Sequence, residues 1–295
     1  MTMEIIKTEQ TAKKVKRQAL RKWVLRLALV VAILAPLTFI MAGLGAKLGL
    51  WDWRFGLGTL TRNVGPKLLM GSGVLGLISL ALACFIQPRK GFIIGILAVA
   101  VAVLGFVRLG AVQKKVASLP FIHDITTDTQ NVPIFTNAIL SERAKTEGVN
   151  TVDYVGKKAP SKAKGADGKP VMKLVSVLQT QSKAYADIRP LILGDDKAVV
   201  FGEVKAAAKQ MGWAIKSENV EAGILEATDT TFWYGFKDDV VIRIHPSEGG
   251  GSVVDVRSIS RVGGSDIGAN AARIRKFLAI MKKAYGLSRR TITGF

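Results

Sequence analysis

The chain has 295 residues, enough for a membrane region and one globular domain of ordinary size. Its mean hydropathy is +0.28 although 22% of the residues are charged, so the apolar residues must be concentrated in one part of the chain. The formal net charge of +20 is spread over an N-terminal segment, short loops and the C-terminal half, which argues against nucleic acid as a partner. The single cysteine, Cys84, excludes an intrachain disulfide and a cysteine-based zinc site.

Three apolar stretches lie in the N-terminal part of the chain, at residues 23–44, 68–86 and 92–112. Each is close to the roughly 20 residues that a helix needs to cross the hydrocarbon core of a bilayer. Because an unpaired backbone amide costs several kcal/mol in lipid, we expect all three to be helices, with a kink at Pro36. A cleaved signal peptide is not expected, since the first stretch is too long and two more follow.

The basic residues near these stretches predict the orientation in the membrane. Residues 1–22 form a basic segment, and the loop QPRKG between the second and third spans carries Arg89 and Lys90. Since Lys and Arg favour the cytoplasmic side, we expect a multi-pass protein of the inner (cytoplasmic) membrane with a cytoplasmic N-terminus and an extracytoplasmic, periplasmic C-terminal domain. A two-span reading would place that domain inside, and four basic residues in the first loop, 45–67, weaken the charge contrast.

The soluble domain is expected at residues 118–287, followed by a short tail at 288–295. Hydrophobic periodicity predicts a helix at 198–211, strands at 213–219, 224–232, 240–245 and 253–260, and a final helix at 266–285. This is an α+β pattern, an antiparallel sheet with flanking helices, preceded by a three-helix transmembrane region. Residues 157–170, rich in Lys, Gly, Ala and Pro, are expected to be an inserted, solvated loop.

The last predicted hairpin carries an alternating polar pattern. Arg243 and His245 share one face of the first strand, and Asp255 and Arg257 share one face of the second. Antiparallel pairing across the turn SEGGGS can bring Arg243 or His245 opposite Asp255, with Glu226 joining from the preceding strand. Two interpretations remain open, an exposed sheet face with cross-strand ion pairs or a polar ligand site.

The segment RVGGSDIG leads into the final helix, whose free N-terminal amides can hold an anion. Arg261 and Arg273 lie near enough in sequence to help. Against this reading, Ser265 or Asp266 can cap the same amides. The candidate ligand-binding residues are therefore Arg243, Asp255, Arg257, Arg261, Asp266 and Arg273.

Other polar groups give little indication of catalysis. His123 lies near Asp124 and Asp128, but their spacing matches no established metal motif, and we expect no metal. Asp238 and Asp239 are adjacent, so they point apart in a strand and are better explained by a turn before it. The sequence has no nucleophile elbow and no P-loop, and we expect no cofactor.

Four motifs together resemble a known family. They are FIHDITTDTQNVP from Phe121, YADIRP from Tyr185, ILEATDTTFWYGFKDDVVIRI from Ile224 and VDVRSISRVGGSDIGANAARIRKFL from Val254. The chain is similar through them to the domain-of-unknown-function family 1499, DUF1499, over most of residues 121–283. The resemblance implies a bacterial protein in which this domain follows a few membrane spans, and it carries no established activity. The segment 157–170 departs from the family pattern.

Two functional classes are compatible with these observations. In the first, the domain is a membrane-tethered binding or interaction module of the cell envelope, with membrane lipids, an anionic small ligand or an envelope protein as partners. In the second, it is a membrane-anchored enzyme that uses Asp255, Arg257, Arg261 and Asp266. The thin pattern of catalytic groups favours the first class.

Overall fold

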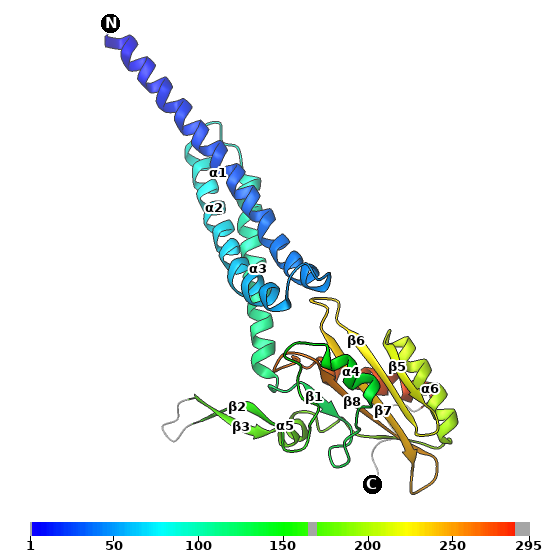
Figure 1. The fold of residues 1–295 in the computed structure, drawn as a ribbon. Helices are drawn as coiled ribbons and strands as arrows, with labels where there is room; N and C mark the ends of the chain where they lie inside the picture. Colours follow the sequence, from blue (N-terminus) through cyan, green and yellow to red (C-terminus); the bar gives the residue numbers. More distant parts are fainter. Residues whose placement is uncertain (1, 165–169, 287–295) are drawn as a thin grey trace. The chain divides into compact units, whose positions relative to one another are not determined.

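A computed structural model describes residues 2–164 and 170–286 of the chain (Figure 1). The chain divides into two compact units, one of Met1–Lys114 with Phe232–Gly235 and the other of Lys115–Thr231 with the chain from Phe236 onward. The predicted tail at 288–295 lies outside the described residues.

The first unit is helical. Its elements are α1 (Thr2–Lys47), the π-helix η1 (Phe55–Val64), α2 (Gly65–Phe85) and α3 (Phe92–Ser118). In the described part of the chain, three helical stretches are long and apolar enough to cross a membrane: Ile5–Lys47, Phe55–Phe85 and Phe92–Ser118. The prediction of a loop across 45–67 was wrong in part, because the chain turns between Lys47 and Phe55 and is helical again from there. The segment FGLGTLTRNV forms η1. Its glycines and threonines interrupt the apolar pattern, so the sequence did not indicate a helix there.

Small residues let these helices approach one another closely. A side chain added at Gly76 would lie 2.9 Å from the Gly95 carbonyl oxygen on α3, which leaves room for glycine alone. Ser72 on α2 donates a hydrogen bond to the Ala98 carbonyl at 2.9 Å. At one end, Arg21 of α1 donates to the Ile86 carbonyl at 3.0 Å and also to that of Pro88, so the basic segment and the α2–α3 loop lie together.

The second unit contains one antiparallel sheet and a separate hairpin. Within the described residues, the sheet has the order β1-β8-β7-β6-β5, and β4 pairs with β8 beside β1. Its strands are β1 (Asp124–Thr126), β4 (Leu191–Leu193), β5 (Ala214–Asn219), β6 (Ile224–Thr230), β7 (Lys237–Pro246) and β8 (Ser252–Ser260). At the β7–β8 turn Gly251 adopts a positive φ of 77° and passes so close to the Leu193 carbonyl that a side chain would clash.

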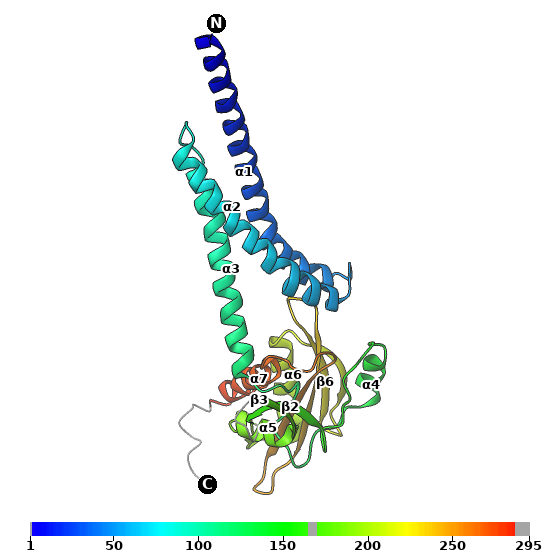
Figure 2. The ribbon, with the colours of Figure 1, turned by 90° about the vertical axis from the view of Figure 1, so that its left-hand side faces the viewer.

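Helices cover both faces of the sheet. On one face α6 (Lys197–Gln210) and α7 (Ala269–Ala284) pack their apolar residues against the inward side chains of β6, β7 and β8. Phe277 of α7 is fully buried and stacks on Trp213 with ring centroids 5.4 Å apart. On the other face the short helix α4 (Asn137–Ala144) contributes Ile139 to a small cluster with Val241 and Ile259. Figure 2 shows α4 on one side of the sheet and α7 on the other.

The α+β prediction is confirmed: α6, β5 to β8 and α7 begin and end within a few residues of their predicted bounds. Asp238 and Asp239, expected in a turn, lie instead inside β7. The solvated loop expected at 157–170 is replaced by the hairpin of β2 (Lys158–Lys164) and β3 (Pro170–Ser176), in which Ala159 is buried. The sequence also did not indicate β1, α4, β4 and α5 (Val177–Ala184), which are too short to show a period.

Candidate functional site

The sheet face beneath α4 is lined with charged side chains. Because side chains alternate along a strand, Asp239, Val241 and Arg243 of β7 point to this face, whereas Val240 and Ile242 point to the apolar core. Neighbouring β8 contributes Asp255, Arg257 and Ile259 in the same way, and Arg261, directly after the last residue of β8, joins them. We call this layer the polar face. Asp239 and Asp255 are 0% exposed, so it is buried, unlike the exposed sheet face weighed from the sequence.

The centre of the polar face is Asp239, which binds two arginines. Arg261, the residue after β8, donates from Nε and Nη2 at 2.9 and 2.8 Å, one bond to each carboxylate oxygen. Arg143 of α4 donates from Nη1 at 2.8 Å, and Thr228 of β6 donates from its hydroxyl at 2.8 Å. Both arginines are at most 4% exposed. Burial lowers the pKa of Arg143, and the Asp239 carboxylate offsets this effect.

A second buried pair joins β1 to β8. Arg257 donates from Nε and Nη2 to the two oxygens of Asp124 at 3.0 and 2.9 Å. Its remaining donors bind the Pro133 carbonyl at 3.0 Å and the Val152 carbonyl, so they anchor the segment on both sides of α4. Its guanidinium also lies over the rings of Phe135 and Tyr154. Each of the three nitrogens of the Arg257 guanidinium thus donates to an internal partner.

The third cluster is the part of the polar face that reaches solvent, and we call it the open corner. It consists of Asp128, Arg243, His245 and Asp255. Arg243 binds the Asp255 carboxylate from Nη2 at 2.6 Å and Asp128 at 3.2 Å, while His245 Nε2 lies 3.1 Å from the same Asp255 oxygen. The side chains of Arg243 and His245 are 17% and 43% exposed, respectively. The register that pairs Arg243 with Asp255 matches the pairing inferred from the sequence.

Glu226 also lies on the polar face but does not join the open corner. It is fully buried, and its two oxygens accept hydrogen bonds from the backbone amide and hydroxyl of Thr136, at 2.6 and 2.5 Å. Thr136 is the N-cap of α4, so this carboxylate fixes the beginning of that helix.

The remaining candidate residues lie elsewhere. Arg273 of α7 is on the opposite face of the sheet, where it binds Asp238 at 2.5 Å and Asp229 at 2.7 Å. The Asp266 carboxylate accepts from the amides of Asn270 and Gly268 at 2.8 and 2.9 Å, so it occupies the helix N-terminus. Burial raises the pKa of Asp266, and these two hydrogen bonds oppose the effect. The structure thus does not bring Arg261 and Arg273 together around the first turn of α7.

Charge is balanced across the polar face. Among the described residues, its carboxylates are Asp124, Asp128, Glu226, Asp239 and Asp255. Its cations, apart from His245, are Arg143, Lys157, Arg243, Arg257 and Arg261. Equal numbers of opposite charges leave no surplus to hold a ligand deep within the layer, because each buried charge already has a counter-charge or hydrogen-bond partner. A ligand can engage this face only where solvent reaches it, and the open corner is its most exposed part: the side chain of His245 is 43% exposed and that of Arg243 17%, against 14% for Lys157.

Sequence reasoning missed Arg143 and the central role of Asp239. Arg143 sits in an eight-residue helix with no clear apolar stripe, so nothing marked it as buried. For Asp239, a strand assignment for 237–239 would have placed it on the same face as Arg243, four residues later.

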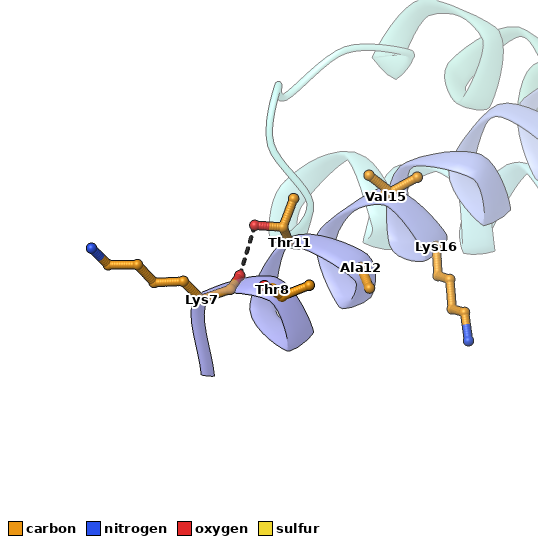
Figure 3. A pocket seen from close by; sticks show the side chains of 6 residues that line it. All are labelled: Lys7, Thr8, Thr11, Ala12, Val15 and Lys16. Atoms are coloured by element: carbon orange, nitrogen blue, oxygen red, sulfur yellow. Dashed lines mark hydrogen bonds between the residues drawn. The ribbon is translucent and has the colours of Figure 1, made fainter. Parts of the chain in front are cut away.

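A shallow hollow of about 590 Å³ lies beside the first turns of α1 (Figure 3). Thr11 donates a hydrogen bond to the Lys7 carbonyl at 2.8 Å within one helical turn. All residues around the hollow come from this single helix, so no groups converge there and we assign it no function. They are Lys7, Thr8, Thr11, Ala12, Val15 and Lys16.

The chain is therefore a protein of mixed class: long apolar helices are followed by an antiparallel α+β domain. That domain contains a buried layer of arginine–carboxylate pairs. Residues 124–281 match the family described as "Protein of unknown function (DUF1499)", and the chain belongs to this family. The resemblance inferred from the four sequence motifs is thereby confirmed. No curated protein matches the chain.

The Asp239 cluster predicts a large loss of stability on substitution. Asp239→Asn removes the counter-charge of two buried arginines, which costs about 3–5 kcal/mol. Hydrogen exchange of the β7 and β8 amides in the detergent-solubilised full chain should then accelerate by roughly 100-fold or more. Asp187→Asn is the control. It breaks a bidentate but exposed ion pair between Asp187 and Arg275, and such a pair contributes less than about 1 kcal/mol to stability. Equal exchange in the two variants would contradict the structural role of Asp239.

His123 predicts a pH dependence. Its Nδ1 lies 3.2 Å from the Gly264 carbonyl and must carry the proton there, while its buried Nε2 has no hydrogen-bond partner among the described residues. Burial, and secondarily the charge of Lys157, lowers the pKa of His123 below the ordinary 6.5. Below about pH 6.5, His123 therefore becomes protonated in the unfolded chain but stays neutral in the folded domain. The free energy of unfolding then decreases as the pH falls. Urea unfolding at pH 7.5 and 5.5 should show this loss, and His123→Gln should reduce it. If the His123→Gln variant loses as much stability between pH 7.5 and 5.5 as the wild type does, the pH dependence comes from other groups.

Proposed function

We propose that the chain is a multi-pass protein of the inner (cytoplasmic) membrane, with a cytoplasmic N-terminus and an extracytoplasmic α+β domain. The three apolar helical stretches support the membrane assignment, because only 28%, 28% and 17% of their most apolar windows are buried inside the protein. The rest of that apolar surface requires lipid. The bonds from Arg21 to the α2–α3 loop support the orientation, since they hold both basic segments at one end of the helical unit.

The domain then acts as a binding or interaction module of the envelope, and the open corner is its ligand site. The observation that carries this proposal is the contrast within the polar face: its other arginines are buried and bonded internally, whereas Arg243 and His245 reach solvent. Arg243 Nη1 makes no hydrogen bond to the described residues, so it offers a donor to an incoming group.

The chemistry of the corner suits an anionic group on a small ligand, a lipid headgroup or a partner protein. A guanidinium beside an imidazole donates several hydrogen bonds in fixed directions, which favours carboxylate or phosphate. The carboxylates of Asp128 and Asp255 hold Arg243 in place through bonds at 3.2 and 2.6 Å. Arg257, Arg261, Asp266 and Arg273 serve this site indirectly, by fixing the sheet and α7.

The enzymatic alternative gains no support from the geometry. Asp255 faces Arg243, Arg257 faces Asp124 and Arg261 faces Asp239. Asp266 caps α7 away from all three. General acid and base catalysis needs such groups around a shared reacting atom, and these four are held apart by different partners.

The orientation has a direct test. A reporter that is active only outside the cytoplasm, fused after Phe295, should be active in intact cells because three spans follow a cytoplasmic N-terminus. The same reporter fused at the α2–α3 loop, after Lys90, should be inactive. Activity in the opposite pattern would refute the proposed topology.

The ligand site predicts a loss of function without a loss of fold. Arg243→Lys keeps the positive charge beside Asp255 but removes the planar fork, so ligand affinity should fall roughly 10- to 100-fold. Hydrogen exchange of β7 and β8 should change little, and cells that lack the native gene should be poorly complemented by the variant. Arg275→Lys, which alters an exposed arginine on α7, should complement fully. Full complementation by an Arg243→Lys, His245→Gln double variant would remove the open corner as the site.

A further inference from the structure

The hairpin of β2 and β3 stands apart from the six-stranded sheet of its domain. Within the described residues these two strands pair with each other and with no other strand, in a register that runs from Lys158 opposite Ser176 to Lys164 opposite Pro170. Figure 1 shows both strands extending beyond the larger sheet, next to α5. An isolated two-stranded hairpin is at best marginally stable in water, so its faces need a surface to pack against.

The domain supplies that surface for one face of the hairpin. Ala159 of β2 is 7% exposed and belongs to the apolar core. The next residue, Pro160, pairs with Leu174, so Leu174 lies on the opposite face, two residues from Met172 on the same side of β3. Met172 and Leu174 are 63% and 68% exposed. We call this second side of the hairpin the outer face, and it leaves two neighbouring large apolar side chains in water.

The hairpin is also strongly basic. In the sequence, residues 158–173 contain five lysines and one aspartate, which gives this short segment a formal charge of +4. Lys158 and Lys173 are exposed in the structure. Like charges repel, so this composition disfavours a second copy of the hairpin as the partner of the outer face. Apolar side chains among lysines are instead typical of segments that bind an anionic membrane surface.

Chain connectivity keeps the base of the hairpin near the membrane. Lys157, directly before β2, places its Nζ atom 3.6 Å from an oxygen of Asp124, the first residue of β1. Helix α3 ends at Ser118, and the six residue steps from there to Asp124 span at most about 20 Å. A seven-residue strand is itself about 23 Å long. The hairpin is therefore long enough to meet the bilayer close to the point where the chain leaves its last apolar helix.

We propose that the outer face of the hairpin binds the surface of the bilayer that holds the helices. Met172 and Leu174 enter the boundary between headgroups and acyl chains, and the lysines contact the phosphates of anionic phospholipids. This inference rests on the membrane assignment made above and goes beyond it. The bilayer then supplies the layer that the outer face lacks, and the flexible thioether of Met172 suits the irregular packing of lipid chains.

The test uses the full chain in lipid nanodiscs, which leave both sides of the bilayer open to solution. In a Cys84→Ser background, which removes the one native thiol, Ser161→Cys carries an environment-sensitive dye on β2 and leaves the apolar pair and every lysine unchanged. The matched control carries the dye at Ile192→Cys on β4, a position that is 64% exposed. Quenching by a lipid with a nitroxide on its headgroup is compared with quenching by aqueous iodide, in phosphatidylcholine with and without phosphatidylglycerol.

With phosphatidylglycerol present, the hairpin dye should be quenched several-fold more by the nitroxide lipid than the control dye, and less by iodide. Omitting phosphatidylglycerol or raising the salt concentration should reduce the lipid quenching, because the contacts of the lysines are electrostatic. Equal lipid quenching at the two positions would overturn the proposal. Protection from iodide without lipid quenching would overturn it too, because the hairpin would then lie against protein.

Substitutions separate the two contributions to binding. Met172→Ser with Leu174→Ser should remove most of the lipid quenching of the hairpin dye, whereas Val220→Ser, at a position outside the hairpin that is 49% exposed, should preserve it. Lys158→Gln with Lys173→Gln keeps the apolar pair and should weaken the response to phosphatidylglycerol, so it tests the proposal even if the serine variant disturbs the hairpin. Wild-type quenching in both double variants would contradict the proposal.

Incorporation into the disc tests the membrane assignment separately. A chain that enters the disc but shows no lipid quenching on the hairpin overturns this inference alone. A chain that does not enter the disc overturns the membrane assignment, and this inference with it.

Discussion

A fully buried Asp239 carboxylate needs positive partners, and this need organises the domain. One of its two arginines comes from α4, the other follows directly after β8, and its hydroxyl donor comes from β6. Because Asp239 itself is on β7, one charge joins a helix to three adjacent strands. An isolated charge in such surroundings would be prohibitively costly, so the folded domain requires α4, β6, β7 and β8 to be in place together. Arg257 repeats the arrangement with Asp124 and the segment around α4, and Glu226 holds the cap of that helix. Helix α4 has only eight residues and buries little apolar surface, so ionic and hydrogen-bond contacts are what keep it on the sheet.

The two faces of the sheet therefore have different chemistry. Beneath α6 and α7 the strands present aliphatic side chains to an apolar core, and that face stabilises the domain through burial. Beneath α4 the same strands present paired charges, which contribute specificity of arrangement more than stability. Asp238 and Asp239 show the division in two residues: the first binds Arg273 of α7 and the second binds Arg143 of α4. A one-residue shift of β7 would place each carboxylate among the wrong partners, so the register is strongly determined.

Long periodic elements were predictable from the sequence, and short ones were not. The helices α6 and α7 and the strands β6 to β8 carry repeated apolar positions, and the Arg243–Asp255 pairing follows from strand alternation across a glycine turn. The strands β1 and β4 have three residues each and take their conformation from β8 rather than from their own pattern. Burial of the polar face was hidden for a related reason: the segment that covers it, around α4, is itself polar, and its contacts to β7 and β8 join residues about 100 positions apart in the chain. Local sequence carries no signal for such a contact.

The direction of β7 fixes where the open corner lies in the sheet. The strand begins at Lys237 and reaches Arg243 six residues later, about 20 Å along the sheet. The beginning of β7 is also the end of the sheet where β1 starts, since Asp238 pairs with Ser260 and Asp124 pairs with Ile259. The chain enters β1 only a few residues after α3 ends at Ser118. Within the sheet, the open corner is therefore displaced toward the β7–β8 turn, away from the strand end at which the chain enters the domain.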